Sequence, residues 1–184
     1  MRFGSLPECF RGTFYRATGL DGSPLALPIS DFSSPVFQEK RRAATYAARL
    51  RSGEGSCFGF SIQGEVAAYF WLSSGVTVPL WRGLRLVVPP GATYVWDCRT
   101  HRPFVRQGLY RRALSDARRI AGPAADVWVT AEDANQASVA AIAEQFDVRQ
   151  RYQVLRVGRV YLTRGGQTTW GREVQLPGGA GMHT

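Results

Sequence analysis

The sequence predicts one α/β domain with a mixed, mostly antiparallel central sheet flanked by helices. Strand-like and helix-like segments alternate after residue 93, as a strand at 94–100, a helix at 107–121, a strand at 126–130 and a helix at 136–146. A hairpin signal precedes this region, and two further strand-like segments follow it. Of the 184 residues, 45% are hydrophobic and 12% are aromatic, which favours a packed core over disorder.

The first part of the chain is predicted to hold one helix. Residues 1–34 are rich in Gly, Pro and Ser, so we expect an irregular stretch with a short strand or hairpin. A helix is expected over 35–51, because apolar residues recur at helical spacing from Val36 to Leu50, and Gly53 ends it.

Strands are expected in the next section. Residues 57–62 and 66–72 flank a Gln-Gly-Glu turn at 63–65, which is a hairpin signal. Residues 81–88 are expected to add one strand before the Pro-Pro-Gly turn at 89–91.

The two later helices have distinct apolar faces. The helix at 107–121 has Leu109 and Leu114 on its buried side and stops at the Gly-Pro pair that follows it. The helix at 136–146 repeats the i, i+3, i+4, i+7 spacing of a buried face with Val139, Ile142, Ala143 and Phe146.

The chain is expected to form a single domain over residues 1–164. Segments 150–156 and 160–164 resemble two antiparallel strands, and no internal repeat divides the sequence. Residues 165–184 are Gly-rich and are expected to be a poorly packed tail.

The charge and the cysteines limit the classes of partner. The net charge is +9, and 22 of the 23 basic residues are arginine, so the surface favours polyanions such as nucleic acid or a phosphate-bearing cofactor. Cys9, Cys57 and Cys98 are widely spaced and form no zinc-binding set, so no metal is expected and a cytoplasmic location is the default. No apolar run reaches the roughly 18 residues of a membrane span, so no membrane partner is expected.

Taken in order, residues 57–164 resemble the GNAT superfamily of acyl-coenzyme A-dependent N-acyltransferases. The strand at 94–100 lies where the family has its splayed central strand, and Gly108 matches the glycine of its Arg/Gln-x-x-Gly-x-Gly/Ala pyrophosphate loop. The Asn-Gln-Ala-Ser run from Asn135 to Ser138 is similar to the family's Asn-x-x-Ala/Ser. The resemblance implies a GNAT fold with acetyl-coenzyme A as co-substrate.

The coenzyme is expected at the glycine turn. A helix N-terminus carries about half a positive charge, and the backbone N–H groups from Arg106 to Tyr110 are expected to bind the pyrophosphate. Asn135 is expected to cap its helix, alone or together with a contact to the pantetheine arm. The candidate coenzyme-binding residues are Cys98, Arg99, Thr100, Arg106, Gln107, Gly108, Leu109, Tyr110, Arg111, Asn135 and Ser138.

The sequence departs from the family at four positions, one of which is Gln145, where the Gly-Phe that commonly ends the last helix has its glycine. Val105 stands where the loop has Arg or Gln, with Arg106 as a neighbouring substitute, and Tyr110 stands where the loop has Gly or Ala. The tyrosine that many members use as general acid is replaced by Ile142 or Ala143. Tyr110 is therefore a catalytic candidate for protonating the departing thiolate, with plain packing as the alternative.

Asp97 is the second catalytic candidate. It lies in a strand between Trp96 and Cys98, and a buried carboxylate needs a partner. It is expected either to take the proton from the acceptor amine or to form an ion pair with Arg99, Arg102 or a residue on a neighbouring strand. Strand alternation places Asp97 on the opposite face from Trp96 and Cys98.

Three functions follow from these features. The first is an N-acyltransferase that transfers an acetyl group from acetyl-coenzyme A to an amine by direct attack. The second is a GNAT-like scaffold that binds a coenzyme or partner without turnover. The third is a basic nucleic-acid-binding module, which is disfavoured because the chain has no aromatic-basic RNA signature and no helix-turn-helix signal.

The acceptor is expected to be a small-molecule amine or an amino sugar. The Tyr-x-x-Asp…Gly-Leu-Tyr pattern resembles that of GNAT-type proteins that act around amino sugars and cell-surface polysaccharides. A protein N-terminus remains open as acceptor, and both a monomer and a homodimer remain open as assembly.

Overall fold

The computed structural model describes residues 8–38, 42–157, 160–164, 169–170 and 172–177. The elements within them are, in chain order, β1 (Glu8–Thr18), β2 (Leu27–Ile29), α1 (Pro35–Gln38), α2 (Ala43–Ser52), β3 (Ser56–Ile62), β4 (Glu65–Ser73), β5 (Thr77–Trp81), β6 (Leu84–Val87), β7 (Ala92–Thr100), the 3-10 helix η1 (Arg102–Phe104), α3 (Leu109–Ala121), β8 (Asp126–Glu132), α4 (Gln136–Ala143), β9 (Asp147–Val157), β10 (Val160–Arg164), β11 (Thr169–Trp170) and β12 (Glu173–Gln175).

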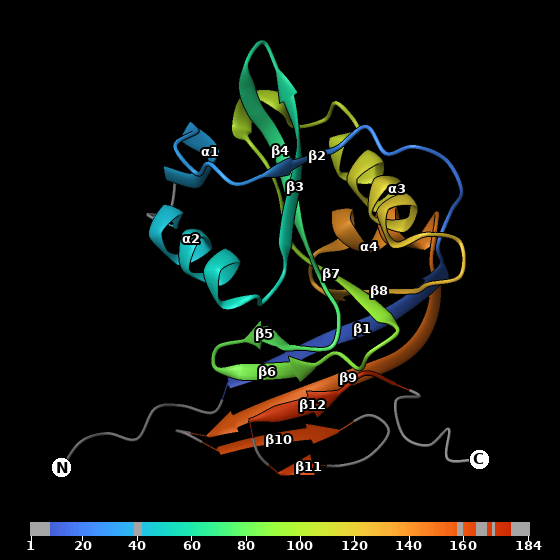
Figure 1. The fold of residues 1–184 in the computed structure, drawn as a ribbon. Coiled ribbons are helices and arrows are strands. Elements are labelled where there is room, and N and C mark those ends of the chain that lie inside the picture. The colour runs from blue at the N-terminus through green and yellow to red at the C-terminus, as the bar shows by residue number, and fades with distance from the viewer. Residues whose placement is uncertain (1–7, 39–41, 158–159, 165–168, 171, 178–184) are drawn as a thin grey trace, which may run out of the picture.

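The described strands form one large sheet and one small sheet. The large sheet has nine strands in the order β11-β10-β9-β1-β8-β7-β4-β3-β2, and the small one has the order β12-β6-β5. Within the large sheet, β7 and β8 run parallel and the other neighbours run antiparallel. Helices α3 and α4 lie on one side of this sheet, and α1 and α2 on the other (Figure 1). The predicted fold class is confirmed.

The strand in the N-terminal segment is longer than the short strand or hairpin that was expected within an irregular stretch over 1–34. Strand β1 has eleven residues and lies inside the large sheet, where it pairs with both β8 and β9. The period-two signal is hidden because residues 12–15 are all buried. Gly12 also weakens the signal, but it is needed there, because a Cβ atom would lie 2.7 Å from the Tyr152 hydroxyl.

Two other segments are divided differently from the prediction. The strand expected at 81–88 is the end of a hairpin, in which Arg82 and Gly83 join β5 to β6 with φ angles of 40° and 93°. A two-residue turn of this type needs positive φ at both positions, and arginine gives no such signal. The helix expected at 35–51 consists of α1 and α2, and Gly53 ends α2 as predicted.

Part of the expected C-terminal tail is packed. Strand β12 pairs in parallel with β6, and Leu176 is buried in the core. The prediction of a poorly packed tail is therefore wrong for residues 173–176. Residues 165–168, 171 and 178–184 lie outside the described part, and the boundary of the domain at residue 164 stays a prediction.

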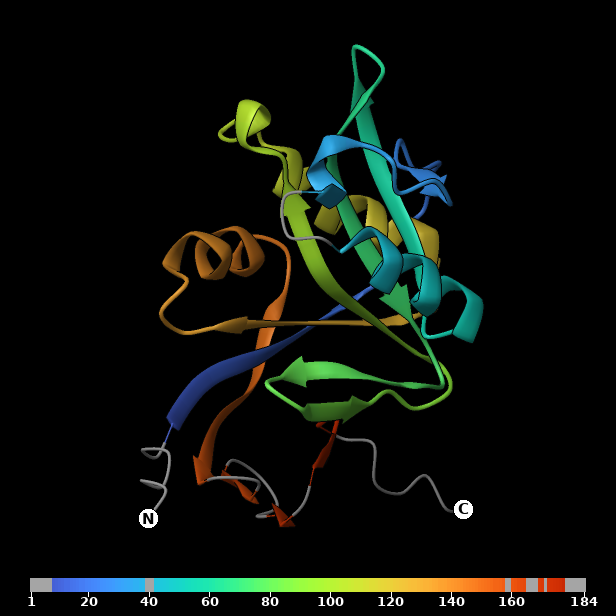
Figure 2. The same ribbon diagram turned by 90° about the vertical axis from the view of Figure 1, so that its left-hand side faces the viewer.

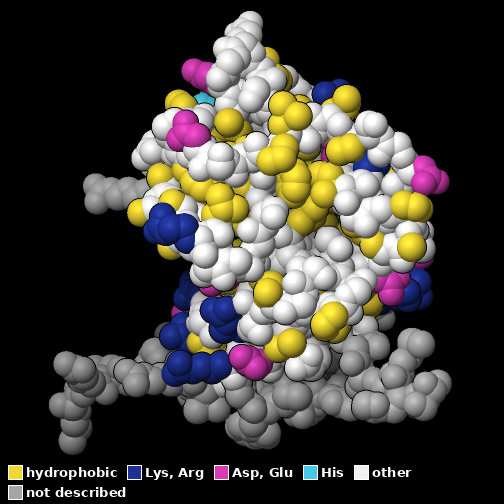
Figure 3. Space-filling model, in the orientation of Figure 1, with side chains coloured by type: hydrophobic (Ala, Val, Ile, Leu, Met, Phe, Trp, Pro, Cys, Tyr) yellow, Lys and Arg dark blue, Asp and Glu magenta, His cyan; other side chains and the backbone are white. Residues whose placement is uncertain are grey.

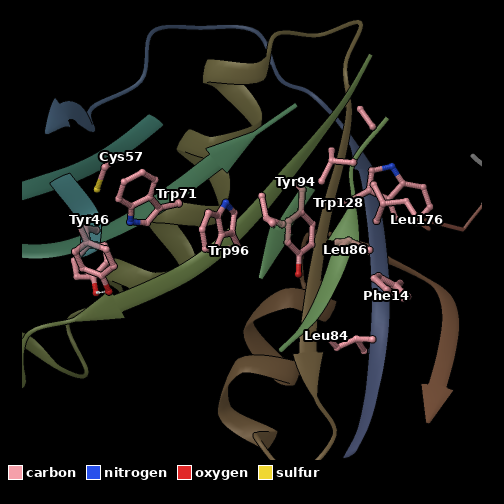
Figure 4. Packing of buried hydrophobic residues seen from close by; sticks show 14 of the residues in the cluster. Phe14, Tyr46, Cys57, Trp71, Leu84, Leu86, Tyr94, Trp96, Trp128 and Leu176 are labelled. Atoms are coloured by element: carbon pink, nitrogen blue, oxygen red, sulfur yellow. Dashed lines mark hydrogen bonds between the residues drawn. The ribbon is translucent and has the colours of Figure 1, made fainter. Parts of the chain in front are cut away.

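The core occupies both faces of the large sheet. One cluster lies between the sheet, α1, α2 and the small sheet, and the other lies beneath α3 and α4. In the first cluster Tyr46, Trp71, Trp96 and Tyr94 follow one another along one side of the sheet (Figure 4). Strands β4 and β7 are therefore packed on both sides. Within the described residues no helix has the length and apolar character to cross a membrane.

Candidate functional site

The site lies where two parallel strands separate. Strands β7 and β8 pair only over their first residues, from Ala92 with Asp126 to Val95 with Val129. Beyond Val95, β7 runs toward η1 and β8 runs toward α4 (Figure 2). Backbone groups on the separating edges lose their partners in the sheet and can bind another molecule.

A β-bulge at Asp97 changes the direction of side chains along β7. Asp97 and Cys98 together lie opposite Phe70, so β7 has one extra residue there. The φ angle of Asp97 is 44°, a left-handed conformation that costs an L-residue about 1 kcal/mol. Arg49 donates to Asp97 at 2.7 Å, and its guanidinium lies 4.6 Å from the centre of the Trp96 ring. Asp97 and Trp96 thus share one face, and the prediction that alternation separates them is wrong.

The carboxylate of Asp97 is surrounded by donors. Arg42 Nη1 donates to Oδ1 at 3.0 Å, while Arg49 Nη1 and the Tyr46 hydroxyl donate to Oδ2 at 2.7 and 3.0 Å. Arg99, named from the sequence as an ion-pair partner, has its Nε 3.8 Å from Oδ1. Both oxygens of Asp97 are therefore occupied, an arrangement that favours anchoring over proton transfer. We call Asp97, Arg42, Tyr46 and Arg49 the Asp97 cluster.

A cavity of about 510 Å³ lies at the N-terminal end of α3. Its walls come from the end of β7, from η1 and the loop after it, and from the first turns of α3 and α4. Most of the predicted coenzyme-binding residues line it, namely Cys98, Arg99, Thr100, Arg106, Gly108, Leu109, Tyr110, Arg111 and Ser138. Gln107 and Asn135 are not among its lining residues, and the sequence reasoning missed Phe104, Val105, Ala137 and Ala141.

The loop that opens α3 has a backbone suited to binding an anion. Arg106 and Gly108 have left-handed φ angles of 66° and 73°, a pattern that turns successive N–H groups toward one side. Gly108 is the N-cap of α3 and makes no side-chain capping bond. The first-turn N–H groups have no acceptor within the helix. A Cβ atom on Gly108 would meet no other atom within 4 Å, so the space beside it is open.

A smaller cavity of about 230 Å³ lies between the separating strands. It shares Cys98, Tyr110 and Ser138 with the larger cavity, so the two adjoin at these residues. The remaining polar residues on its walls are Asp97, Thr130, Glu132 and Asn135. Glu132 is an exposed carboxylate at the end of β8 that the sequence reasoning missed. Its position at the end of a strand, three residues before the capping asparagine, is the signal that could have found it.

Tyr110 lies in the first turn of α3, where the two cavities adjoin. Burial raises the pKa of its phenol well above the ordinary value, Cys98 raises it further, and a hydrogen bond with Ser138 lowers it in part. The phenol is therefore protonated at neutral pH and can donate. Of the two residues expected at the family's tyrosine position, Ile142 is fully buried in the core and Ala143 is exposed.

Asn135 and Cys98 complete the walls. The Asn135 side-chain oxygen accepts from the backbone N–H of Ser138 at 3.3 Å, which confirms the predicted cap, while the contact with pantetheine stays a prediction. Burial raises the pKa of the Cys98 thiol, so little thiolate forms at neutral pH. Among the described residues, no three His, Cys, Asp or Glu side chains lie close enough together to hold a metal ion.

Comparison with known proteins tests the fold. No protein-family model and no curated protein matches the sequence. Among solved structures, an acetyltransferase of the GNAT family from Colwellia psychrerythraea aligns with a TM-score of 0.56 and 12% identity, covering 84% of this chain and 58% of that one. The chain has a GNAT fold.

A second GNAT-family structure, from Novosphingobium aromaticivorans, aligns with a TM-score of 0.55 and 16% identity. The alignment covers 79% of this chain and 63% of the chain from Novosphingobium aromaticivorans. The present chain therefore spans about three-fifths of the length of each of these two proteins. At such low identity the likeness concerns the fold and not the reaction.

The arginine-rich surface of the GNAT fold is partly neutralised by ion pairs. Arg82 and Arg156 both pair with Glu8, and Arg111 Nη2 lies 2.7 Å from the Glu144 carboxylate. On the face in Figure 3, basic side chains gather at the lower left and acidic side chains lie among and around them. The basic side chains that are visible on this face are therefore interspersed with acidic ones.

Proposed function

We propose that this protein is an N-acyltransferase that moves an acetyl group from acetyl-coenzyme A to an amine by direct attack. The proposal rests on the two adjoining cavities, one at the N-terminus of α3 and one between β7 and β8. A thioester that extends from the first cavity into the second would place its carbonyl beside the separated strands. A backbone N–H group there would stabilise the oxyanion that forms during attack.

The coenzyme would bind along the wall of the larger cavity. Its pyrophosphate would lie at the loop around Gly108, where N–H groups and the positive end of the α3 dipole point toward an anion. Arg106 adds positive charge beside this loop, whereas Arg111, which also lines the cavity, pairs with Glu144. Asn135 and Ser138, at the start of α4, would face the pantetheine arm.

Two residues would move protons during the transfer. Glu132 would take the proton from the acceptor amine, because it lines the smaller cavity and is exposed, whereas Asp97 is occupied by Arg42 and Arg49. Tyr110 would return a proton to the departing thiolate, because its side chain lies where the two cavities adjoin and its phenol is protonated at neutral pH. The acceptor would be a small-molecule amine, with amino sugars included in the class.

Thermal unfolding with acetyl-coenzyme A tests coenzyme binding. At a ligand concentration about 100-fold above Kd the expected stabilisation is about 2.7 kcal/mol. For a chain of this size that corresponds to a rise in Tm of roughly 5–10 °C. Free coenzyme A should give a similar rise and ATP a smaller one. No rise at millimolar acetyl-coenzyme A, or an equal rise with ATP, would contradict the proposal.

One observation favours a second candidate, a scaffold that binds the coenzyme without turnover. The position at which many members have their general acid is Ile142 or Ala143 here, and neither of these side chains has a proton to donate. Saturable coenzyme binding, with no product from a broad panel of amines and amino sugars, would support the scaffold over the enzyme.

A further inference from the structure

We propose that Asp97 is a positioning residue, and that Arg42 and Arg49 hold it so that β7 keeps its bulge and stays separated from β8. This inference rests on the proposed function, because the gap between the two strands is where transfer would take place. It assigns a role to the part of α2 that faces the sheet, far from the coenzyme loop.

The bulge needs an external constraint, because its backbone conformation is unfavourable. Asp97 is a non-glycine residue with a φ angle of 44°, at the point where β7 has one more residue than β4. Three donors bind its carboxylate from one direction, two of them guanidinium groups. Hydrogen bonds between ions are stronger than neutral ones, so they can hold the backbone in this conformation.

Arg49 is itself fixed in place. Its guanidinium lies 4.6 Å from the Trp96 ring centre and 5.1 Å from that of Tyr46. The side chains of Arg49 and Asp97 are only 15% and 12% exposed, so water competes weakly with their ion pair. The Tyr46 hydroxyl also lies 2.7 Å from that of Tyr69 on β4, which links the cluster to the neighbouring strand.

Loss of the bulge would change the site directly. Side chains alternate along a strand, so removing one extra residue moves every later side chain to the other face. Cys98, which now faces the junction of the two cavities, would turn toward α2. The strand edge beside the thioester would then present different backbone groups, although no residue of the Gly108 loop had changed.

A double-mutant cycle separates positioning from base catalysis. Asp97→Asn removes the charge but keeps a residue type that tolerates left-handed φ, and Arg49→Met keeps an unbranched apolar stem without the guanidinium group. We expect each variant to lower kcat about tenfold with little change in the KM for acetyl-coenzyme A, and the double variant to be no worse than either one. The acidic limb of the pH profile of kcat/KM should be unchanged.

The opposite pattern would overturn the inference. If Asp97 is the base, Asp97→Asn should lose about 100-fold or more in kcat/KM together with the acidic limb, while Arg49→Met should stay near wild type. Arg49→Lys is the conservative variant, and it should recover part of the kcat lost in Arg49→Met.

Amide hydrogen exchange of the free protein gives a readout that needs no turnover. Arg49→Met should speed exchange about tenfold in β7 after Trp96, with α3 and β8 unchanged. Unchanged exchange, or equal acceleration across the whole sheet, would mean that the cluster adds only general stability. This measurement decides the role of the Asp97 cluster even if the proposed activity fails.

Discussion

Replacing Gly108 with alanine separates coenzyme binding from folding, because Gly53 provides a matched control. The two glycines have φ angles of 73° and 71°, each adjoins a helix end, and a Cβ at either meets no atom within 4 Å. The strain of a left-handed alanine should therefore be similar at both, about 1–2 kcal/mol. The difference is that Gly108 lines the larger cavity and Gly53 ends α2.

The expected changes in Tm follow from the similar backbone conformation of the two glycines. At roughly 2–4 °C per kcal/mol, the strain should lower the Tm of both free variants by about 2–8 °C. Gly53→Ala should keep the full rise of roughly 5–10 °C at a ligand level about 100-fold above the wild-type Kd. If the methyl weakens binding about thirtyfold, the ligand is only about threefold above the new Kd, and RT ln 4 gives about 0.8 kcal/mol, or roughly 2–3 °C.

The assay is differential scanning fluorimetry of the wild type and both variants over a series of acetyl-coenzyme A concentrations. The coenzyme-dependent rise in Tm is compared, so the shared strain cancels. If Gly108→Ala keeps the same rise as Gly53→Ala at every concentration, the loop before α3 does not bind the coenzyme, and the placement of the pyrophosphate is wrong.

Three other variants give distinct outcomes. Glu132→Gln should lower kcat/KM about 100-fold or more and remove the acidic limb of the pH profile of kcat/KM, while coenzyme binding stays intact. A loss in kcat/KM below about threefold would exclude Glu132 as the base. Tyr110→Phe should lower kcat about 100-fold. Because burial raises the pKa of Tyr110, the wild-type kcat should also stay level up to about pH 10, and a fall centred near pH 8 would contradict this role. Asp116→Ala should lower the free energy of unfolding, measured with urea, by about 3–5 kcal/mol. The reason is that the fully buried Asp116 accepts from two backbone N–H groups at 2.8 Å and from Arg119 at 2.7 Å. A decrease of less than about 1 kcal/mol would contradict this role of Asp116.

The sequence predicted best those elements that depend on local patterns. Helix α3 follows from its apolar stripe and its glycine stop, and the hairpin of β3 and β4 follows from the turn at Gln63 and Gly64, whose φ angles are 52° and 84°. Strand β1 was predicted only as a short strand or hairpin, although it is a central strand of eleven residues. Burial on both faces removes the alternation that marks a strand. A glycine stands at position 12 because the side chain of Tyr152, far along the chain, leaves no room for a Cβ atom.

In the candidate site, too, the features set by adjacent residues could be predicted and those set by distant residues could not. Gly108 and Asn135 could be predicted, because a left-handed turn and a helix cap are set by adjacent residues. Of the partners of Asp97, Arg99 could be predicted from its place in the same strand, whereas Arg42 and Arg49 could not, because they lie 55 and 48 residues earlier in the chain. The sequence around Glu132 shows that it ends a strand three residues before Asn135, but not that it lines a cavity, because that requires β7 and β8 to separate beyond Val95 and Val129.

The most direct measurement is product formation from acetyl-coenzyme A and a panel of amines and amino sugars. The acetylated amine is detected by mass spectrometry, and coenzyme A release is followed in parallel with a thiol reagent. We predict an acetylated product in equal amount to the released coenzyme A, lost with Glu132→Gln and retained with Gly53→Ala. Tight coenzyme binding with no product from any amine would contradict the enzyme and leave the scaffold.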